Sequence, residues 1–200
     1  LGNIEGFSRQ LELAEGDRGC LFAENRPEWI YAFYAGWSRG AVNAAVDSGA
    51  GEDELLAVLE DCRPKVVLVS RKTAEVMERA RKKLSYRPQV LVLEEMAERF
   101  ESETPPGAGD FTLPIDPEKT ALILYTSGTT GEPKGVMLSF RSVYFNMQAV
   151  FETGLIDGGD VLLALFPFHH TVPLQGHVIC PLYLGSTIVF VKSLTSDEIL

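Results

Sequence analysis

Apolar residues along the chain alternate between short continuous runs and stretches with helical spacing. The short runs in the first half occupy residues 19–24, 41–46, 66–69 and 89–93. A continuous apolar run of this length is typical of a strand that is buried on both faces of a sheet. Strand patterns that alternate with helix patterns predict an α/β fold, in which a mostly parallel sheet carries helices on both faces.

The stretches between these runs predict helices over residues 27–40, 52–62 and 72–84. Pro27 suits the first turn of a helix, and Gly40 lies where a glycine commonly ends one. Leu55 and Leu59 share one face of the second helix. Aromatic residues at helical spacing in the first helix are expected to pack in the core.

Residues 98–119 interrupt this alternation, because prolines and glycines occur there among acidic residues. Such a composition is typical of an exposed connection. We therefore expect one α/β half over residues 1–97 and a second half over residues 120–200.

The alternation resumes after this connection. The pattern predicts a strand at 120–126, a loop at 127–135, a helix at 139–153, and strands at 161–166 and 187–191. The sequence TSDE at 195–198 matches a capping box, which marks the start of a helix. Because the sequence stops at Leu200, we expect it to be a piece of a longer protein.

Composition and charge narrow the functional classes. The chain has 28 acidic and 18 basic residues and a net charge of −10, which argues against a nucleic-acid-binding surface. The three cysteines, Cys20, Cys62 and Cys180, are widely spaced and suggest neither a disulfide framework nor a zinc site. Buried free thiols in a reducing cytoplasm are expected, and no apolar stretch approaches the ~20 residues of a membrane span.

The segment 125–136, YTSGTTGEPKGV, combines residue types that bind phosphate. Its glycines permit positive φ and close approach of the backbone to a ligand, and exposed N–H groups in such a turn bind anions. Lys134 adds a positive charge. The glycines are Gly128, Gly131 and Gly135, and the hydroxyl donors are Thr126, Ser127, Thr129 and Thr130. A polar surface loop is the alternative, but this combination directly after a buried strand favours a phosphate site.

This loop is not a Walker A motif, which needs adjacent glycine and lysine followed by serine or threonine. Here Gly131 is followed by Glu132, and Lys134 is followed by Gly135.

The segment resembles the phosphate-binding signature of the AMP-forming adenylating superfamily, which includes acyl-CoA synthetases, adenylation domains of peptide synthetases and firefly luciferase. Two further stretches support the resemblance, ENRPEWI at 24–30 followed by GAVNAAVD, and FPFHHTVPL at 166–174. The resemblance covers residues 16–200 and implies part of the large N-terminal domain of such an enzyme. Two departures affect the expected shape of the pocket. Phe140 follows Ser139 where histidine is frequent, and Pro173 stands where glycine is common.

The resemblance implies two half-reactions. A carboxylate attacks the α-phosphorus of ATP to give an acyl-adenylate and pyrophosphate, and the thiol of coenzyme A then displaces AMP. The implied nucleotide-binding residues are Thr126, Ser127, Gly128, Thr129, Thr130, Gly131, Pro133, Lys134 and Gly135, and Thr130 is also the implied contact to Mg²⁺. Lys134 and His170 are the implied catalytic residues. His170 matches the motif histidine, which lies near the carboxylate and the adenylate, whereas His169 and His177 are expected to be structural.

The leading hypothesis is an acyl-CoA synthetase, with ENRPEWI and FPFHHTVPL favouring the branch that acts on fatty acids. The alternatives are a ligase that stops at the adenylate, an adenylation domain that loads a carrier protein, a non-catalytic nucleotide-binding module, and a structural domain. The family's later motifs lie beyond Leu200, so residues 1–200 alone are expected to be inactive. Acyl chain length, oligomeric state and any peripheral membrane association of the longer enzyme stay open.

Overall fold

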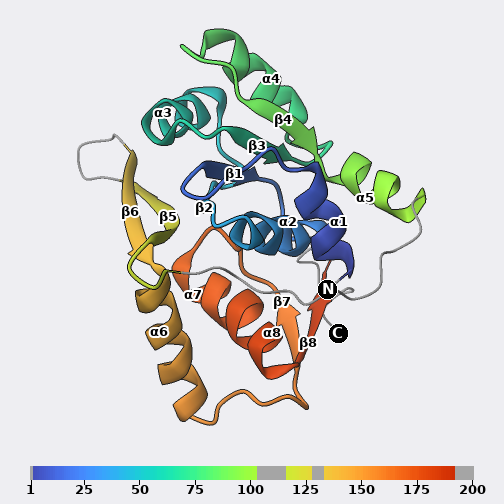
Figure 1. The fold of residues 1–200 in the computed structure, drawn as a ribbon, viewed down its shortest axis with the longest axis vertical. Helices are drawn as coiled ribbons and strands as arrows, with labels where there is room; N and C mark the ends of the chain where they lie inside the picture. The colour runs from blue at the N-terminus through green and yellow to red at the C-terminus, as the bar shows by residue number, and fades with distance from the viewer. Residues whose placement is uncertain (1, 103–115, 128–132, 192–200) are drawn as a thin grey trace.

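A computed structural model describes residues 2–102, 116–127 and 133–191, which form an α/β fold around a six-stranded sheet (Figure 1). Its strands are β1 (Arg18–Phe22), β2 (Val42–Ala45), β3 (Val66–Val69), β4 (Gln89–Val92), β5 (Thr120–Ser127) and β6 (Pro133–Ser139). The order across the sheet is β4-β3-β1-β2-β5-β6. All neighbours pair in parallel except β5 and β6, which are antiparallel. The predicted fold class is confirmed.

Helices cover both faces of this sheet. One face carries α1 (Gly2–Gln10), α2 (Pro27–Ser38), α5 (Leu93–Ser102) and α6 (Phe140–Glu152), and the other carries α3 (Glu52–Cys62) and α4 (Ala74–Lys83). Side chains alternate between the two faces along each strand. On β5, Leu122 and Leu124 face the first layer, while Ile123 and Tyr125 face the second. Burial on both faces explains why the central strands are continuous apolar runs.

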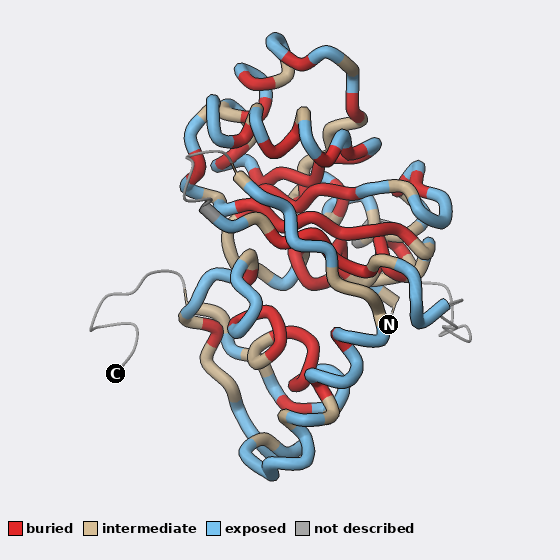
Figure 2. Tube along the Cα trace, turned by 90° about the vertical axis from the view of Figure 1, so that its left-hand side faces the viewer, coloured by how far each residue is buried: buried red, intermediate tan, exposed pale blue. Residues whose placement is uncertain are grey.

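A smaller group of elements lies beside the large sheet, as Figure 2 shows. It contains a parallel pair of strands, β7 (Val161–Ala164) and β8 (Thr187–Phe190), with α7 (Thr171–Pro173), the π-helical segment η1 (Leu174–Ile179) and α8 (Cys180–Leu184) between them. No helix in the described ranges is both long and apolar enough to cross a membrane. All three cysteines are free and buried, as the sequence predicts.

The aromatic residues of α2 form the centre of the core. Trp29 stacks on Phe33 with ring centroids 5.3 Å apart, and Phe33 contacts Trp37 at 4.4 Å. The Trp37 indole N–H donates to the carbonyl of Ala121 at 3.0 Å, which joins the helix to β5. Gly40 follows the helix with φ of +67°, so its predicted role at the helix end is confirmed.

The predicted loop over 127–135 is wrong at both ends. The strand β5 continues to Ser127, and Pro133 begins β6, which pairs back onto β5 before α6 starts. The residues Pro133, Lys134 and Gly135 have low strand propensity, so local sequence favours a loop. Pairing with β5 and contact with α3 override that preference.

Two helices differ from the prediction. The helix α1 was not predicted, and α5 begins at Leu93, where a strand was expected to end, and continues into the expected connection at 98–119. Phe100 of α5 packs so closely on α1 that a Cβ at Gly6 would lie 2.0 Å from its ring. Because β5 pairs with β2, the sheet takes strands from both sides of this connection. The division into two halves stays a prediction.

The other boundaries agree within a few residues. Ser139 caps α6, and its Oγ accepts a hydrogen bond from the Ser142 N–H at 3.2 Å. The strands predicted at 161–166 and 187–191 correspond to β7 and β8. The capping box at 195–198 lies outside the described residues.

Close packing between α2 and β2 gives a stability prediction. The buried Asn43 Nδ2 donates to the carbonyl of Phe33 at 2.7 Å, and a Cβ at Gly36 would lie 2.4 Å from Asn43 Oδ1. Gly36→Ala is expected to lower the free energy of unfolding in urea by about 1–3 kcal/mol, because overpacking displaces the asparagine. Gly176→Ala is the control, since its Cβ would meet nothing within 4 Å. Equal stability of the two variants would contradict this packing.

Candidate functional site

The carboxyl ends of the parallel strands meet along one edge of the large sheet. Glu24 and Asn25 follow β1, Asp47 follows β2, Ser70 follows β3, and Thr126 lies near the end of β5. In open α/β sheets, ligands bind in the crevice beyond these ends. This edge, called the carboxyl edge below, is therefore the candidate site.

The pair Thr126 and Lys134 stands at one end of the carboxyl edge. The two residues lie opposite each other in the β5–β6 ladder, and both are exposed. Their side chains lie on the opposite face from Tyr125, because side chains alternate along a strand. The Lys134 side chain makes no hydrogen bond or ion pair with another described residue, so its ammonium is available for an anion.

Only part of the rest of the predicted phosphate loop lies within the residues that the structure describes. Gly128, Thr129, Thr130 and Gly131 lie outside them, while Ser127 and Pro133 form the last pair of the ladder. At Gly135 the predicted positive φ is wrong, and close approach of its backbone to a ligand stays a prediction. A Cβ there would lie 2.9 Å from Ile123 Cγ2 and 3.2 Å from Tyr125 Cζ. Packing on β5 is thus one reason for glycine at this position.

The segment 166–170, which contains the two adjacent histidines, is attached to the same edge. Asn25 Nδ2 donates to the carbonyl of Phe166 at 2.8 Å, and Asn25 Oδ1 accepts from the Phe168 N–H at 3.0 Å. Phe168 is buried edge-on against Trp29, with ring centroids 5.3 Å apart. The family-like segments at 24–30 and 166–174 therefore lie in contact.

The adjacent histidines have different environments. The His169 side chain is mostly buried, with 13% of its surface exposed, and its Nε2 lies 3.9 Å from Asp47 Oδ2. Burial and the neighbouring His170 lower the pKa of His169, and Asp47 opposes this shift. His170 is exposed and directly precedes α7, with its ring centroid 4.0 Å from that of His169. His170 is thus the more accessible imidazole of the two at this edge.

His177 lies apart from this pair, in the π-helical segment η1. Its ring contacts Phe166 with centroids 6.3 Å apart. Its Nδ1 is buried and has no hydrogen-bond partner among the residues that the structure describes.

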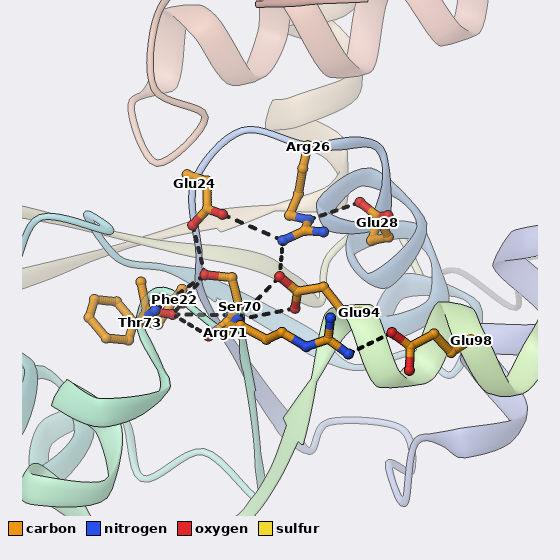
Figure 3. A network of polar contacts seen from close by, with 9 residues as sticks. All are labelled: Phe22, Glu24, Arg26, Glu28, Ser70, Arg71, Thr73, Glu94 and Glu98. Atoms are coloured by element: carbon orange, nitrogen blue, oxygen red, sulfur yellow. Dashed lines mark hydrogen bonds and ion pairs between the residues drawn. The ribbon is translucent and has the colours of Figure 1, made fainter. Parts of the chain in front are cut away.

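A network of polar side chains closes the other end of the carboxyl edge (Figure 3). Arg26 donates to Glu28 at 2.9 Å, and it also pairs with Glu24 and Glu94. Ser70 Oγ donates to Glu24 Oε2 at 2.7 Å. These groups come from the ends of β1, β3 and β4, so the network ties three strand ends together.

Charges inside this network are paired with one another. Burial would lower the pKa of the Arg26 guanidinium, but Glu28 and Glu94 raise it above its usual value. Burial would raise the pKa of Glu94, but hydrogen bonds from its own backbone N–H, Arg26 and the Arg71 N–H bring it below its usual value. Because the charges and hydrogen bonds of these groups are paired with one another, we assign the network a role in stabilising the fold. The β5–β6 end of the carboxyl edge is then the end available to a ligand.

An apolar cavity of about 850 Å³ lies away from the carboxyl edge, between α2, α6 and α8. Its lining includes Trp37, Phe140, Tyr144 and Leu182. A polyphosphate needs hydrogen-bond donors and positive charge, which a mostly apolar lining does not supply. The cavity is therefore not the candidate nucleotide site.

Comparison with known proteins decides the family. The family model described as AMP-binding enzyme matches residues 5–200. The chain belongs to the AMP-binding enzyme family. The identification rests on almost the entire chain, including the strands of the large sheet, the β5–β6 hairpin and the histidine segment.

Curated relatives in this family are acid–CoA ligases by name. The chain is 29% identical over 196 residues to the mitochondrial malonate–CoA ligase ACSF3 of Bos taurus, covering 92% of this chain and 32% of that protein. It is 29% identical over 167 residues to the long-chain-fatty-acid–CoA ligase FadD13 of Mycobacterium tuberculosis, covering 82% of this chain and 33% of that protein. The chain thus spans about a third of the length of these relatives.

Solved structures share the fold. The inhibitor-bound N-terminal domain of FACL13 from Mycobacterium tuberculosis matches with a TM-score of 0.85 and 25% identity, covering 99% of this chain and 50% of that one. ATP-bound MatB from Rhodopseudomonas palustris matches with a TM-score of 0.82 and 22% identity, covering 99% of this chain and 40% of that one. The latter likeness concerns the fold alone.

The polar network predicts a pH-dependent contribution to stability. Glu94 has a lowered pKa in the folded chain, so its contribution is present above the unfolded value and is lost as the pH falls through the folded value. Glu94→Gln is expected to lower the free energy of unfolding by about 1–3 kcal/mol at neutral pH. The difference from the unsubstituted chain should shrink once the pH falls below about 4.3.

Glu98→Gln is the matched control on the same helix, because its pair with Arg71 is exposed. Exposed pairs contribute little, so this variant should differ by less than about 1 kcal/mol. Urea unfolding at a series of pH values measures both variants. A Glu94→Gln difference that stays constant down to acid pH would refute the proposed linkage.

Proposed function

We propose that the protein containing this chain is an ATP-dependent acid–CoA ligase, which activates a carboxylic acid as its adenylate and transfers the acyl group to coenzyme A. The observation that carries the proposal is the exposed Thr126–Lys134 pair, which shares the carboxyl edge with His170. Membership of the AMP-binding enzyme family and relatives named as CoA ligases support it.

In this proposal the β5–β6 end of the edge holds the phosphates of ATP. Thr126 donates a hydroxyl hydrogen bond and Lys134 supplies positive charge, as phosphoryl chemistry requires. The proposed set of nucleotide contacts also includes Ser127, Gly128, Thr129, Thr130, Gly131, Pro133 and Gly135. These residues act by positioning and by stabilising charge, without forming a covalent intermediate.

Mg²⁺ fits this arrangement as the partner of the nucleotide. The described residues contain no group of three or more His, Cys, Asp or Glu that could hold a metal ion. Mg²⁺ in such sites keeps several waters and binds substrate phosphates with few protein ligands, one of which can be a threonine hydroxyl. We assign that contact to Thr130. When bound, the ion would neutralise phosphate charge.

His170 is proposed to bind the acid. Its exposed imidazole can donate a hydrogen bond to a carboxylate at the edge where the phosphates bind. The segments ENRPEWI and FPFHHTVPL and the similarity to a long-chain-fatty-acid–CoA ligase favour a fatty acid. The buried free thiols fit a cytoplasmic enzyme.

Pyrophosphate release by the protein at its natural length tests this function. Mg-ATP is supplied with acetate, malonate and fatty acids up to palmitate, with and without coenzyme A. Release with a preferred acid and formation of a CoA thioester are expected. Adenylate without thioester would instead favour a ligase that stops at the adenylate or loads a carrier protein. No release with any acid would refute an adenylating function.

Lys134→Ala should reduce adenylation without destabilising the protein, because the side chain is exposed. We expect kcat to fall by about 10²–10³-fold, as when one preorganised transition-state contact is removed, and Thr130→Ala to act in the same direction. Lys82→Ala, at an exposed lysine of α4, is the charge-matched control. If Lys134→Ala and Lys82→Ala have equal rates, Lys134 has no role in catalysis.

The two adjacent histidines should separate into different roles. His170→Ala is expected to lower the acid-dependent rate by about 10²-fold, with unchanged unfolding in urea. His169→Ala should instead lower the free energy of unfolding, because its mostly buried ring lies against Asp47. Steady-state kinetics and urea titration measure both. The opposite assignment of rate and stability effects would show that His169 is the functional histidine.

A further inference from the structure

A hydrogen bond joins the strand that carries Thr126 to the helix packed behind it. The Tyr125 hydroxyl donates to Asp61 Oδ2 at 2.5 Å. Asp61 belongs to the last turn of α3, and Tyr125 directly precedes Thr126 on β5. Asp61 and Tyr125 are 64 residues apart in the sequence, so no local pattern indicates this contact.

Other contacts fix the last turn of α3. The Tyr86 hydroxyl donates to the carbonyl of Leu59 at 3.0 Å, and Ser85 donates its N–H and hydroxyl to Glu60 at 2.6 and 2.8 Å. Arg63 ends the helix with φ of +44°, and its guanidinium lies 5.0 Å from the centroid of the Tyr86 ring. The last turn of α3 is therefore anchored by contacts that do not involve β5.

Tyr125 also holds the neighbouring strand. Its ring lies over Gly135 of β6, where a Cβ would be 3.2 Å from Tyr125 Cζ. An aromatic side chain packed over a cross-strand glycine fixes strand register. The strand β6 is the last in the sheet order, so among the described strands it pairs with β5 alone. The helix α3 also contacts β6.

The pair Tyr125 and Gly135 is adjacent in the ladder to the pair Thr126 and Lys134. A shift of one residue in register would turn every side chain of β6 to the other face of the sheet. We propose that Asp61 and Tyr125 are positioning residues. Their hydrogen bond connects the β5–β6 ladder to α3 and thereby orients the side chains of Thr126 and Lys134 toward the phosphates of ATP. This inference rests on the proposed function.

The environment of Tyr125 keeps it a hydrogen-bond donor. Burial and the hydrogen bond to Asp61 raise the pKa of Tyr125 well above its usual value. The phenol therefore stays neutral across the range in which the enzyme would be assayed, and its contact with the carboxylate persists.

The test compares Tyr125→Phe with Tyr86→Phe in the protein at its natural length. Both changes remove a hydroxyl that bonds to the last turn of α3, and both keep the ring. The Tyr86 side chain is not attached to β5, so it is the matched control for loss of a hydrogen bond. Unfolding in urea and steady-state kinetics with ATP, acid and coenzyme A are measured for each.

We expect Tyr125→Phe and Asp61→Ala each to lower kcat/KM for ATP by about tenfold or more, as small displacements of reacting groups do. The KM values for acid and coenzyme A should change by less than about twofold, because the displaced groups contact the phosphates. Asp61→Asn keeps an acceptor oxygen and should recover most of the loss. The double variant Asp61→Ala/Tyr125→Phe should have the same kcat/KM for ATP as the less active of the two single variants, because the two residues share one contact.

The inference is wrong if Tyr125→Phe and Tyr86→Phe have the same ATP kinetics while the unsubstituted enzyme is active. It is also wrong if the loss of kcat/KM in Tyr125→Phe and Asp61→Ala equals the loss in the fraction of folded protein. If the unsubstituted protein releases no pyrophosphate with any acid, the proposed function itself fails, and this inference fails with it.

Discussion

Parallel pairing of β1, β2, β3 and β5 is the constraint on which the rest of the structure depends. Parallel strands run in one direction, so their carboxyl ends must lie along one edge of the sheet. Residues far apart in the sequence are thereby brought together. Glu24, Asp47, Ser70 and Thr126 reach the same edge only because helices return the chain to its starting side between strands.

The carboxyl edge has two ends with different electrostatic character. At the end formed by β1, β3 and β4, the Arg26 guanidinium is surrounded by carboxylates, and the charges satisfy one another. At the end formed by β5 and β6, the ammonium of Lys134 has no partner within the described ranges and is exposed. The net charge of the chain is −10, so a locally cationic end of the edge differs in sign from the molecule as a whole.

Local patterns in the sequence predict much of the fold. Strands β1 and β3 are buried on both faces, so each appears as a continuous apolar run. Ser139 marks the start of α6 because capping depends on residues within one turn. The phosphate segment is visible because its residue types lie next to one another in the chain.

Features set by distant contacts could not be predicted. The strand β6 begins with Pro133, Lys134 and Gly135, whose local preference is a loop, and it forms because β5 is available for pairing. Asp61 gains a partner only when α3 is placed behind β5. Gly135 is explained by the Tyr125 ring that packs on it, whereas the sequence suggested backbone freedom.

A crystal structure of the protein at its natural length, with ATP and Mg²⁺ bound, tests the central claim most directly. We predict that the β- and γ-phosphates lie at the carboxyl edge, with Lys134 Nζ and the Thr126 hydroxyl within hydrogen-bond distance of their oxygens. Phosphates bound elsewhere, with Lys134 still exposed to water, would contradict it.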